Sequence, residues 1–413
     1  MFLRAVSDPL VTPFTTSWET SNMAVPRTIS GLRRATAVGC AAVVAMSGVE
    51  LSLAGATTAP ATVGTTHVAT HEWAAAQPTA VGRQILDLEV HDGKVWAGYG
   101  DYGANTGPIT IASYDPTNPD GFAAATVVDT EAALNLRSLG DELVAPATDP
   151  RRAADFAIGA PWEQDRPVAA THVFDTATLT GEDLWLVGSK GNDAVAWRSL
   201  DDGATWDESL RVSPPGDIDG DFSRFYFAAT MGGALYVQAV SHSRGAGASS
   251  MMFDGSTWSE APSLLTNGGV GWKPQPFGDG VVYGNTGQGI AGGIYYFDGE
   301  SVTTIGVGWD VEVAGGSVWI LALDGQVTRS RDLVDWNTVV TGPSDSRSMA
   351  VDGEDLYLGT ADSQLVTVRV DASADAVELE PEPTPEIEDR PSKGNRPDRG
   401  ERCPKGWAKR GRC

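Results

Sequence analysis

An internal repeat constrains this chain more than any other feature of its sequence. From Gln84 to Val370 one pattern recurs: a turn rich in Gly and acidic residues, an apolar run that usually holds an aromatic residue, and a turn of small residues. Successive copies are 36 to 51 residues apart. The copies begin at Asp92, Gly140, Gly181, Gly232, Gly278, Gly315 and Asp352.

A repeat of this length with several short strands is typical of a β-propeller. Radial packing of four-stranded sheets covers their faces and leaves only short edges. We therefore predict an all-β fold, a β-propeller of about seven four-stranded blades over residues 73–370. A pair of β-sandwiches is the alternative. The apolar runs do not alternate with polar residues, which predicts strands buried on both faces.

The outer half of one repeat carries the pattern S-x-D-x-G-x-T-W. Its residues are Ser199, Asp201, Gly203, Thr205 and Trp206. Shortened copies occur at Ser330–Trp336 and Phe253–Trp258. The pattern resembles the Asp box of sialidases and other BNR-repeat propellers. The resemblance implies a hairpin turn between the outer strands of a blade, with the Trp packed between blades. These residues are therefore expected to be structural.

The resemblance does not extend to a catalytic site. A sialidase needs three arginines on the substrate carboxylate, a Tyr nucleophile with a Glu partner, and an acid/base Asp. The segment Gly82–Asp87 lacks the family's Arg-Ile-Pro signature. Arg137, Arg224 and Arg347 fall on comparable strands of three repeats, where they are predicted to face an anionic ligand at the central channel. Solvated or salt-bridged arginines are the alternative interpretation.

Alternating carboxylates follow a Pro-Pro-Gly turn at Asp217, Asp219 and Asp221. Carboxylates spaced in this way coordinate calcium through oxygen ligands in other proteins. The segment resembles the start of an integrin-type calcium loop. The match fails at Phe222 and Phe225, so an acidic surface turn is the other interpretation. No other cofactor is expected. His67 and His71 lie in a Thr- and Ala-rich stretch and are expected to be an ordinary solvated pair.

The N-terminal segment reads as a secretory signal over residues 23–56. It has a basic start, an apolar run at Ala35–Val49 and an Ala-Gly-Ala cleavage site at Ala54–Ala56. Residues 1–22 fit no part of a signal, so Met23 is the expected start and residues 1–56 are expected to be dispensable. An uncleaved anchor and a lipid-modified Cys40 are alternatives. Residues 57–72 are predicted to be a flexible lead-in.

The C-terminal residues form two charged segments. Residues 371–391 are a Pro-rich linker with eight acids from Asp371 to Asp389 and no base between them, which predicts an extended, disordered chain. Residues 392–413 are a basic tail, and its last segment runs from Cys403 to Cys413. In an oxidising compartment these two cysteines are predicted to form a disulfide. Intermolecular pairing and free thiols are the alternatives.

Taken with the charge, these features predict an extracellular binding protein. A formal net charge of −25 disfavours nucleic acid and anionic membranes as partners. We expect a secreted monomer without a transmembrane anchor in its mature form, associated with the cell wall or free. Its expected function is binding or scaffolding of a glycan, cell-wall or protein ligand. The alternative function is a glycoside hydrolase, sialidase-like or using two carboxylates.

Overall fold

The computed structural model describes residues 64–370, with the exception of 141, 147, 149–155, 160–162, 166–167, 180–182, 202, 215–219, 242–244, 265–270 and 286–289. These residues form seven four-stranded antiparallel sheets and one short helix, α1 (Glu72–Ala75). No helix among them is long and apolar enough to cross a membrane. The signal segment, the acidic linker and the cysteine-bounded tail lie outside the described residues.

Each sheet is built from strands that follow one another along the chain, and we call the sheets blades 1 to 7. Blades 1 to 3, from first to fourth strand, are β2 (Asp87–His91), β3 (Lys94–Gly98), β4 (Ile109–Tyr114) and β5 (Phe122–Val128); β6 (Arg137–Leu139), β7 (Glu142–Pro146), β8 (Phe156–Gly159) and β9 (Glu163–Asp165); β10 (His172–Ala177), β11 (Leu184–Lys190), β12 (Asp193–Ser199) and β13 (Asp207–Val212). Blades 4 to 6 are β14 (Ser223–Met231), β15 (Ala234–Ser241), β16 (Gly245–Phe253) and β17 (Trp258–Glu260); β18 (Trp272–Phe277), β19 (Gly280–Gly284), β20 (Gly292–Phe297) and β21 (Val302–Gly308); β22 (Asp310–Ala314), β23 (Ser317–Leu321), β24 (Gln326–Ser330) and β25 (Asn337–Thr341). Blade 7 is β26 (Ser346–Asp352), β27 (Asp355–Thr360), β28 (Gln364–Arg369) and β1 (Thr66–Thr70).

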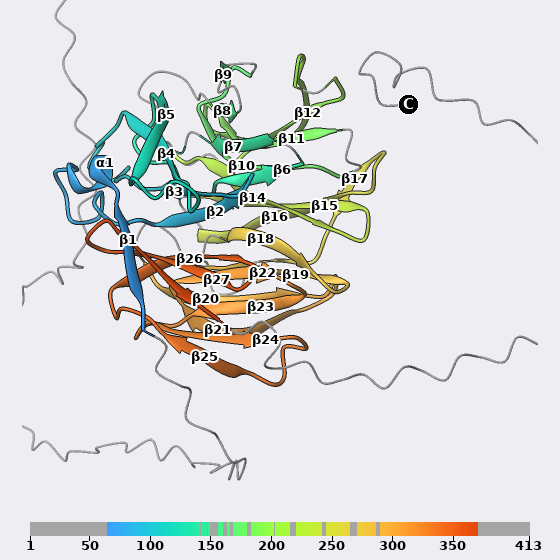
Figure 1. The fold of residues 1–413 in the computed structure, drawn as a ribbon. Helices are drawn as coiled ribbons and strands as arrows, with labels where there is room; N and C mark the ends of the chain where they lie inside the picture. Colours follow the sequence, from blue (N-terminus) through green and yellow to red (C-terminus); the bar gives the residue numbers. More distant parts are fainter. Residues whose placement is uncertain are drawn as a thin grey trace, which may run out of the picture. The chain divides into compact units, whose positions relative to one another are not determined.

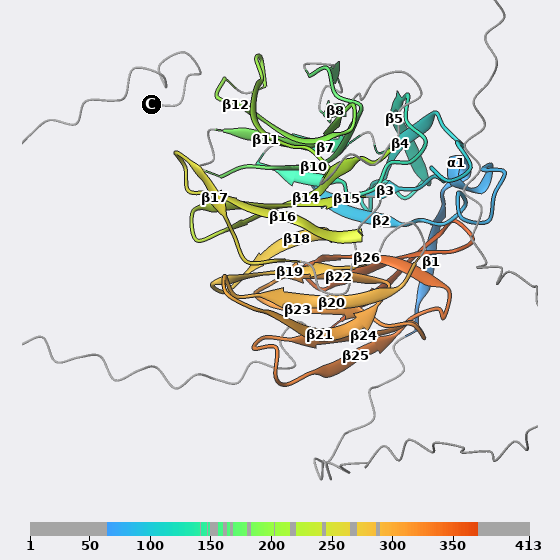
Figure 2. The same cartoon turned by 180° about the vertical axis from the view of Figure 1, so that it is seen from behind.

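The first strands of the blades form a closed ring. Each contacts the first strand of the next blade, in the order β2, β6, β10, β14, β18, β22 and β26, and β26 contacts β2 again. Figures 1 and 2 show the succession of sheets from two sides. The expected all-β propeller is therefore confirmed.

The last blade is completed by β1, the first strand of the described chain, which forms its outermost strand. In Figure 1 the blue strand β1 lies beside the red end of the chain. Thr66 pairs with Thr367 and Ala69 with Leu365. The expectation of a flexible lead-in over residues 57–72 is therefore wrong for Thr66–Thr70, and the propeller begins before residue 73. This strand covers an edge of β28 that would otherwise be free to pair.

His71, which follows this strand, is also not solvated as expected. Its ring is fully buried, and its Nδ1 accepts a hydrogen bond from the backbone N–H of Ala74 at 3.0 Å. It therefore caps the N-terminus of α1, and it packs against Tyr99 and Phe122. Burial lowers the pKa of His71 to about 4, so this ring is neutral at physiological pH.

The core lies between the blades and thins toward their outer strands. All eight residues of β15 and all five of β23 are buried, whereas most residues of the fourth strands β5 and β13 are exposed or half-buried. Second strands packed on both faces explain apolar runs without alternation. The turns before them are tight: Asp92 and Gly93 both have positive φ, 51° and 67°. This conformation suits a two-residue hairpin.

The S-x-D-x-G-x-T-W segment forms the turn between β12 and β13. Asp201 Oδ1 accepts the backbone N–H of Thr205 at 2.8 Å, and the hydroxyl of Ser199 accepts that of Gly203 at 2.8 Å. The Trp206 indole donates to the Gly203 carbonyl at 2.9 Å and packs with residues of blades 2 and 3. Carboxylates accept turn N–H groups in the same way in four other blades, at Asp115, Asp254, Asp298 and Asp332.

Candidate functional site on the loop face

The two ends of the ring carry very different amounts of chain. At one end, two-residue turns such as Asp92–Gly93 join first to second strands, and the aspartate turns join third to fourth strands. At the other end, where the first strands begin, lie longer connections such as 71–86 and 99–108. We call these ends the turn face and the loop face. Loops on a rigid scaffold commonly carry binding residues, which makes the loop face the candidate site.

Carboxylates on the first strands bind the next blade. Asp87 accepts the backbone N–H of Leu136 at 2.5 Å, Asp175 that of Ala228 at 2.8 Å, and Asp310 that of Met349 at 2.9 Å. In each case the acceptor lies on one blade and the donor in the following one. A carboxylate that accepts backbone N–H groups away from water is well placed to hold neighbouring sheets in register.

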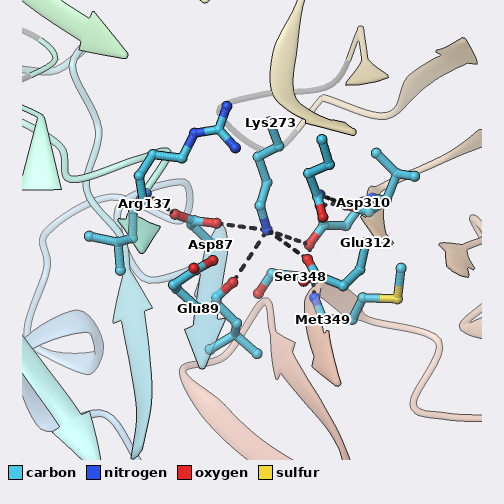
Figure 3. A network of polar contacts seen from close by, with 12 residues as sticks. Asp87, Glu89, Arg137, Lys273, Asp310, Glu312, Ser348 and Met349 are labelled. Atoms are coloured by element: carbon cyan, nitrogen blue, oxygen red, sulfur yellow. Dashed lines mark hydrogen bonds and ion pairs between the residues drawn. The ribbon is translucent and has the colours of Figure 1, made fainter. Parts of the chain in front are cut away.

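Lys273 lies at the centre of this ring of carboxylates, as Figure 3 shows. Its Nζ is 2.9 Å from Asp87 Oδ1 in blade 1, 3.5 Å from Asp310 Oδ2 and 3.8 Å from Glu312 Oε2 in blade 6. It also donates to the Leu88 carbonyl at 3.3 Å. The lysine begins in blade 5, so its side chain links three blades. The sequence interpretation did not single out any of these residues.

Burial, and to a smaller extent neighbouring charges, shift the pKa of several groups in this network. Burial raises the pKa of Asp310 to about 6 and that of Glu312 to about 8, although Lys273 opposes both shifts. Burial also raises the pKa of Glu89. Burial alone would lower the pKa of Lys273, but its carboxylate neighbours outweigh that effect and raise it well above its usual value. Lys273 is therefore a permanent cation.

Arg137 completes the network rather than waiting for a ligand. Its Nε and Nη2 donate to the two oxygens of Asp175 at 2.9 and 3.2 Å, and Nη2 donates to the Pro274 carbonyl at 2.9 Å. These contacts join blade 2 to blades 3 and 5. Together, Arg137 and Lys273 fill the centre of the ring with paired charges. We call this set the channel network: Asp87, Glu89, Arg137, Asp175, Lys273, Asp310 and Glu312.

The three arginines predicted to act together lie at different depths. All three are on first strands, as expected. We count residues of the second strands from the turn face. Arg137 pairs with the third residue of β7, Val144, whereas Arg224 pairs with the seventh residue of β15, Val240. Arg347 falls where the register shifts between Ser346 and Ser348. Since bulges re-aim side chains, equal strand positions in the sequence do not give equal positions in the ring.

Arg224 and Arg347 lie on aromatic rings at the loop face. The Arg224 guanidinium carbon is 4.1 Å from the centre of the Phe222 ring, and that of Arg347 is 4.1 Å from the centre of the Trp309 ring. Both side chains are half-buried. Such stacking holds a guanidinium flat while its N–H edge remains able to bind an acceptor.

More aromatic side chains adjoin Arg224 along neighbouring first strands. Arg224 also lies 5.8 Å from the ring of Phe174 in blade 3. Tyr226 contacts Phe174 at 4.5 Å between ring centres and Trp272 of blade 5 at 6.1 Å. We call the following set the loop-face cluster: Phe174, Phe222, Arg224, Tyr226, Trp272, Trp309 and Arg347. Of these, Phe174 is buried and the others are half-buried.

Of the predicted calcium ligands, only Asp221 is among the described residues. Its carboxylate is buried and accepts hydrogen bonds from the backbone N–H of Phe222 and the hydroxyl of Ser241. Asp217 and Asp219 lie outside the described residues. Within the part of the chain that is described, no group of three or more potential ligands is placed to hold a metal ion. The calcium site stays a prediction.

Comparison with known proteins concerns the fold alone. The sequence matches no family model and no curated protein. Among solved structures, virginiamycin B lyase from Staphylococcus aureus is 12% identical with a TM-score of 0.48, over 74% of this chain and 99% of that one. The WD40 propeller domain of Doa1 is 12% identical, with a TM-score of 0.48, over 75% and 98%. A GH74 enzyme from Niastella koreensis is 17% identical, with a TM-score of 0.45, over 70% and 44%.

Proposed function

We propose that this propeller is a secreted or cell-surface binding or scaffold protein whose loop face holds an extracellular glycan, cell-wall or protein ligand. The loop-face cluster carries the proposal, because half-buried aromatic and arginine side chains gather there on several first strands. Large aromatic groups and arginines are the residues that binding surfaces use most. The ion pairs of the channel network join some of the first strands that carry this cluster to other first strands.

The chemistry of the carboxylates favours binding over catalysis. A two-carboxylate glycosidase needs two carboxyl groups that face the substrate. On the first strands, Asp87, Asp175 and Asp310 are instead bonded to the next blade and to Lys273 or Arg137. Within the channel network, the rival glycoside hydrolase is left with Glu89, which also accepts the backbone N–H of Ser138 at 3.1 Å, and with Glu312, which lies 3.8 Å from Lys273. We expect no hydrolysis of a fluorogenic sialoside or of a neutral β-glucan.

We further propose that the chain is an Asp-box propeller of the BNR type. The support is the hydrogen bonding of the turn at Ser199–Trp206 and the similar carboxylate turns in four other blades. Secretion is a separate proposal: N-terminal analysis of extracellular protein should begin at Thr57 or a neighbour. Recovery of residues 1–22 in that protein would contradict it.

Binding is tested by retention of the purified protein on insoluble cell-wall and glycan matrices. Trp272→Ala should lower retention because the variant removes a ring of the loop-face cluster. The matched control is Trp336→Ala, since Trp336 is also half-buried but lies in an aspartate turn on the turn face. Equal retention of wild type and Trp272→Ala on every matrix would contradict the proposed site.

Turnover decides between the two classes of function. Hydrolysis of a glycan that disappears in Glu312→Gln, in a variant that remains folded, would replace the binding proposal by the hydrolase.

A further inference from the structure

We propose that the loop face selects glycans that carry carboxylate groups over neutral glycans. This inference rests on the proposed function, because it names the ligand class of the same site. It is carried by two arginines, Arg224 and Arg347, that are fixed on aromatic rings and whose positive charge no carboxylate neutralises within the described residues.

Arg224 is positioned but not satisfied. Its guanidinium carbon lies over the Phe222 ring at 4.1 Å and over the Phe174 ring at 5.8 Å, measured to the ring centres. No hydrogen bond or ion pair engages it among the described residues. The nearest acid in sequence, Asp221, is bonded to Phe222 and Ser241. A half-buried guanidinium with its donors unused is the group best suited to hold a carboxylate with two parallel hydrogen bonds.

Arg347 repeats this arrangement on another side of the ring. It stacks on Trp309, which immediately precedes β22 in blade 6, while Arg347 itself lies in blade 7. Its Nη1 donates to the carbonyl of Ser346 at 2.8 Å, and its buried Nε has no hydrogen-bond partner among the residues that the structure describes. Two cationic sites on separate blades favour a ligand with repeated anionic groups over one with a single charge.

The aromatic rings beside these arginines favour a sugar as the carrier of the charge. Tyr226 and Trp272 are half-buried; Tyr226 lies on the same strand as Arg224, and its ring is 6.1 Å from that of Trp272 on the next first strand. Aromatic side chains offer an apolar face to a ligand, with polar groups that fix its orientation. A chain of acidic sugars presents both an apolar face and a carboxylate at each residue.

Charge elsewhere in the molecule does not cancel this selectivity. The net charge of −25 repels polyanions at long range, and salt screens that repulsion beyond about 8 Å at physiological ionic strength. The carboxylates nearest the axis are paired with Lys273 and Arg137. Contact with the two arginines therefore decides between an acidic and a neutral glycan at close range.

The geometry of the chain ends suits a binding experiment. Thr66 pairs with Thr367, and Arg369 pairs with Asp355 beside the turn between β26 and β27. Both ends of the propeller therefore lie on the turn face. Attachment of the full chain to a sensor through its C-terminus therefore uses the end of the chain that leaves the propeller on the face opposite the loop-face cluster.

The decisive probes are polygalacturonate and its fully methyl-esterified form, which share one backbone and differ in charge. We expect wild type to bind the charged form at least about tenfold more tightly, and Arg224→Gln and Arg347→Gln each to lose about tenfold, since a hydrogen bond to a charged group changes affinity by about a factor of ten or more. Arg369→Gln is the control, because it makes the same charge change at an exposed turn-face residue. Circular dichroism checks that each variant is folded.

The outcomes separate this inference from the function on which it rests. Equal affinity for both forms, lowered by Trp272→Ala but not by either arginine variant, would overturn the selectivity and leave a glycan-binding site. Tight binding of poly-glutamate without binding of polygalacturonate would contradict a glycan ligand and favour an acidic protein as the ligand. Absence of binding to any glycan would overturn this inference and leave a protein as the ligand of the proposed function.

Discussion

The Nζ of Lys273 in blade 5 lies 2.9 Å from the Asp87 carboxylate in blade 1, across the ring of first strands. The same carboxylate accepts a backbone N–H from blade 2. One lysine therefore neutralises the group that ties the first two blades together, while it also lies close to Asp310 of blade 6. Lys273 is the cation that three carboxylates of two blades share, and the first prediction concerns its removal.

Lys273→Met should destabilise the fold by about 3–5 kcal/mol, because it leaves buried carboxylates without their partner. The loss should be larger at pH 8 than at pH 6, since protonation relieves part of the repulsion at lower pH. Chemical denaturation measures both values. Lys190→Met is the control. Lys190 is exposed, and its Nζ forms a surface ion pair with Glu208 at 3.6 Å, so its loss should change the free energy of unfolding by less than about 1 kcal/mol.

The channel network should also make stability fall as the pH rises. Glu312 has a folded-state pKa of about 8 and a usual value of 4.5, because burial disfavours its charged form. Its contribution to the free energy of unfolding is fully present below about pH 4.5 and is lost as the pH approaches 8. His71 has the opposite slope between its folded pKa of about 4 and its usual value of 6.5. The decisive window is therefore pH 6.5 to 8.

Within that window the denaturation midpoint of wild type should fall, and Glu312→Gln should remove much of the fall, because glutamine stays neutral. The surface turns do not interfere, since the pKa of Asp254 is lowered to about 2 and its contribution is complete well below pH 6.5. A midpoint that rises from pH 6.5 to 8, or an unchanged slope in Glu312→Gln, would contradict the assignment of a neutral carboxyl to this position.

Local patterns in the sequence were sufficient to predict the architecture but not its centre. The apolar runs and the Gly and Asp turns repeat along the chain, so they predict blades wherever they occur. The network depends on contacts between distant segments, such as Lys273 with Asp87. One signal was available: Asp87 and Asp310 each lie eight residues before the apolar marker of their repeat, Val95 or Val318. A repeated acid within an apolar strand indicates a partner in the next blade.

The three predicted arginines lie on the expected strands but at different depths in the ring. The sequence places Arg137, Arg224 and Arg347 on equivalent strands, but bulges in β14 and β26 change the depth and direction of the side chains. The pairing of Arg137 with Asp175 also needs two blades in contact before it is visible. Closure by β1 was missed because Thr66–Thr70 lies nearly 300 residues from its partner strand and carries no turn motif.

That closing strand gives a third prediction. Ala69 is buried in blade 7 and pairs with Leu365, so Ala69→Asp would place a carboxylate in the apolar cluster around Ile85 and Leu88. We expect a loss of at least about 2 kcal/mol, because a charged group buried without a partner is costly. His67→Asp is the matched control on the exposed side of the same strand. Thermal unfolding of the two variants compares them directly, and equal midpoints would mean that β1 is dispensable for closure.

The last prediction concerns Trp206 in the turn between β12 and β13. Its indole donates to Gly203, and its ring packs against an apolar cluster that includes Val144 of blade 2 and Leu186 of blade 3, so it contributes to the packing between two blades. Trp206→Ala should therefore cost about 3 kcal/mol in chemical denaturation, by loss of apolar burial and creation of a cavity. Leu200→Ala in the same turn should cost less than about 0.5 kcal/mol, because 70% of Leu200 is already exposed. If both variants lose the same stability, the ring of Trp206 does not link the blades and the motif acts only through the hydrogen bonds of Asp201 and Ser199.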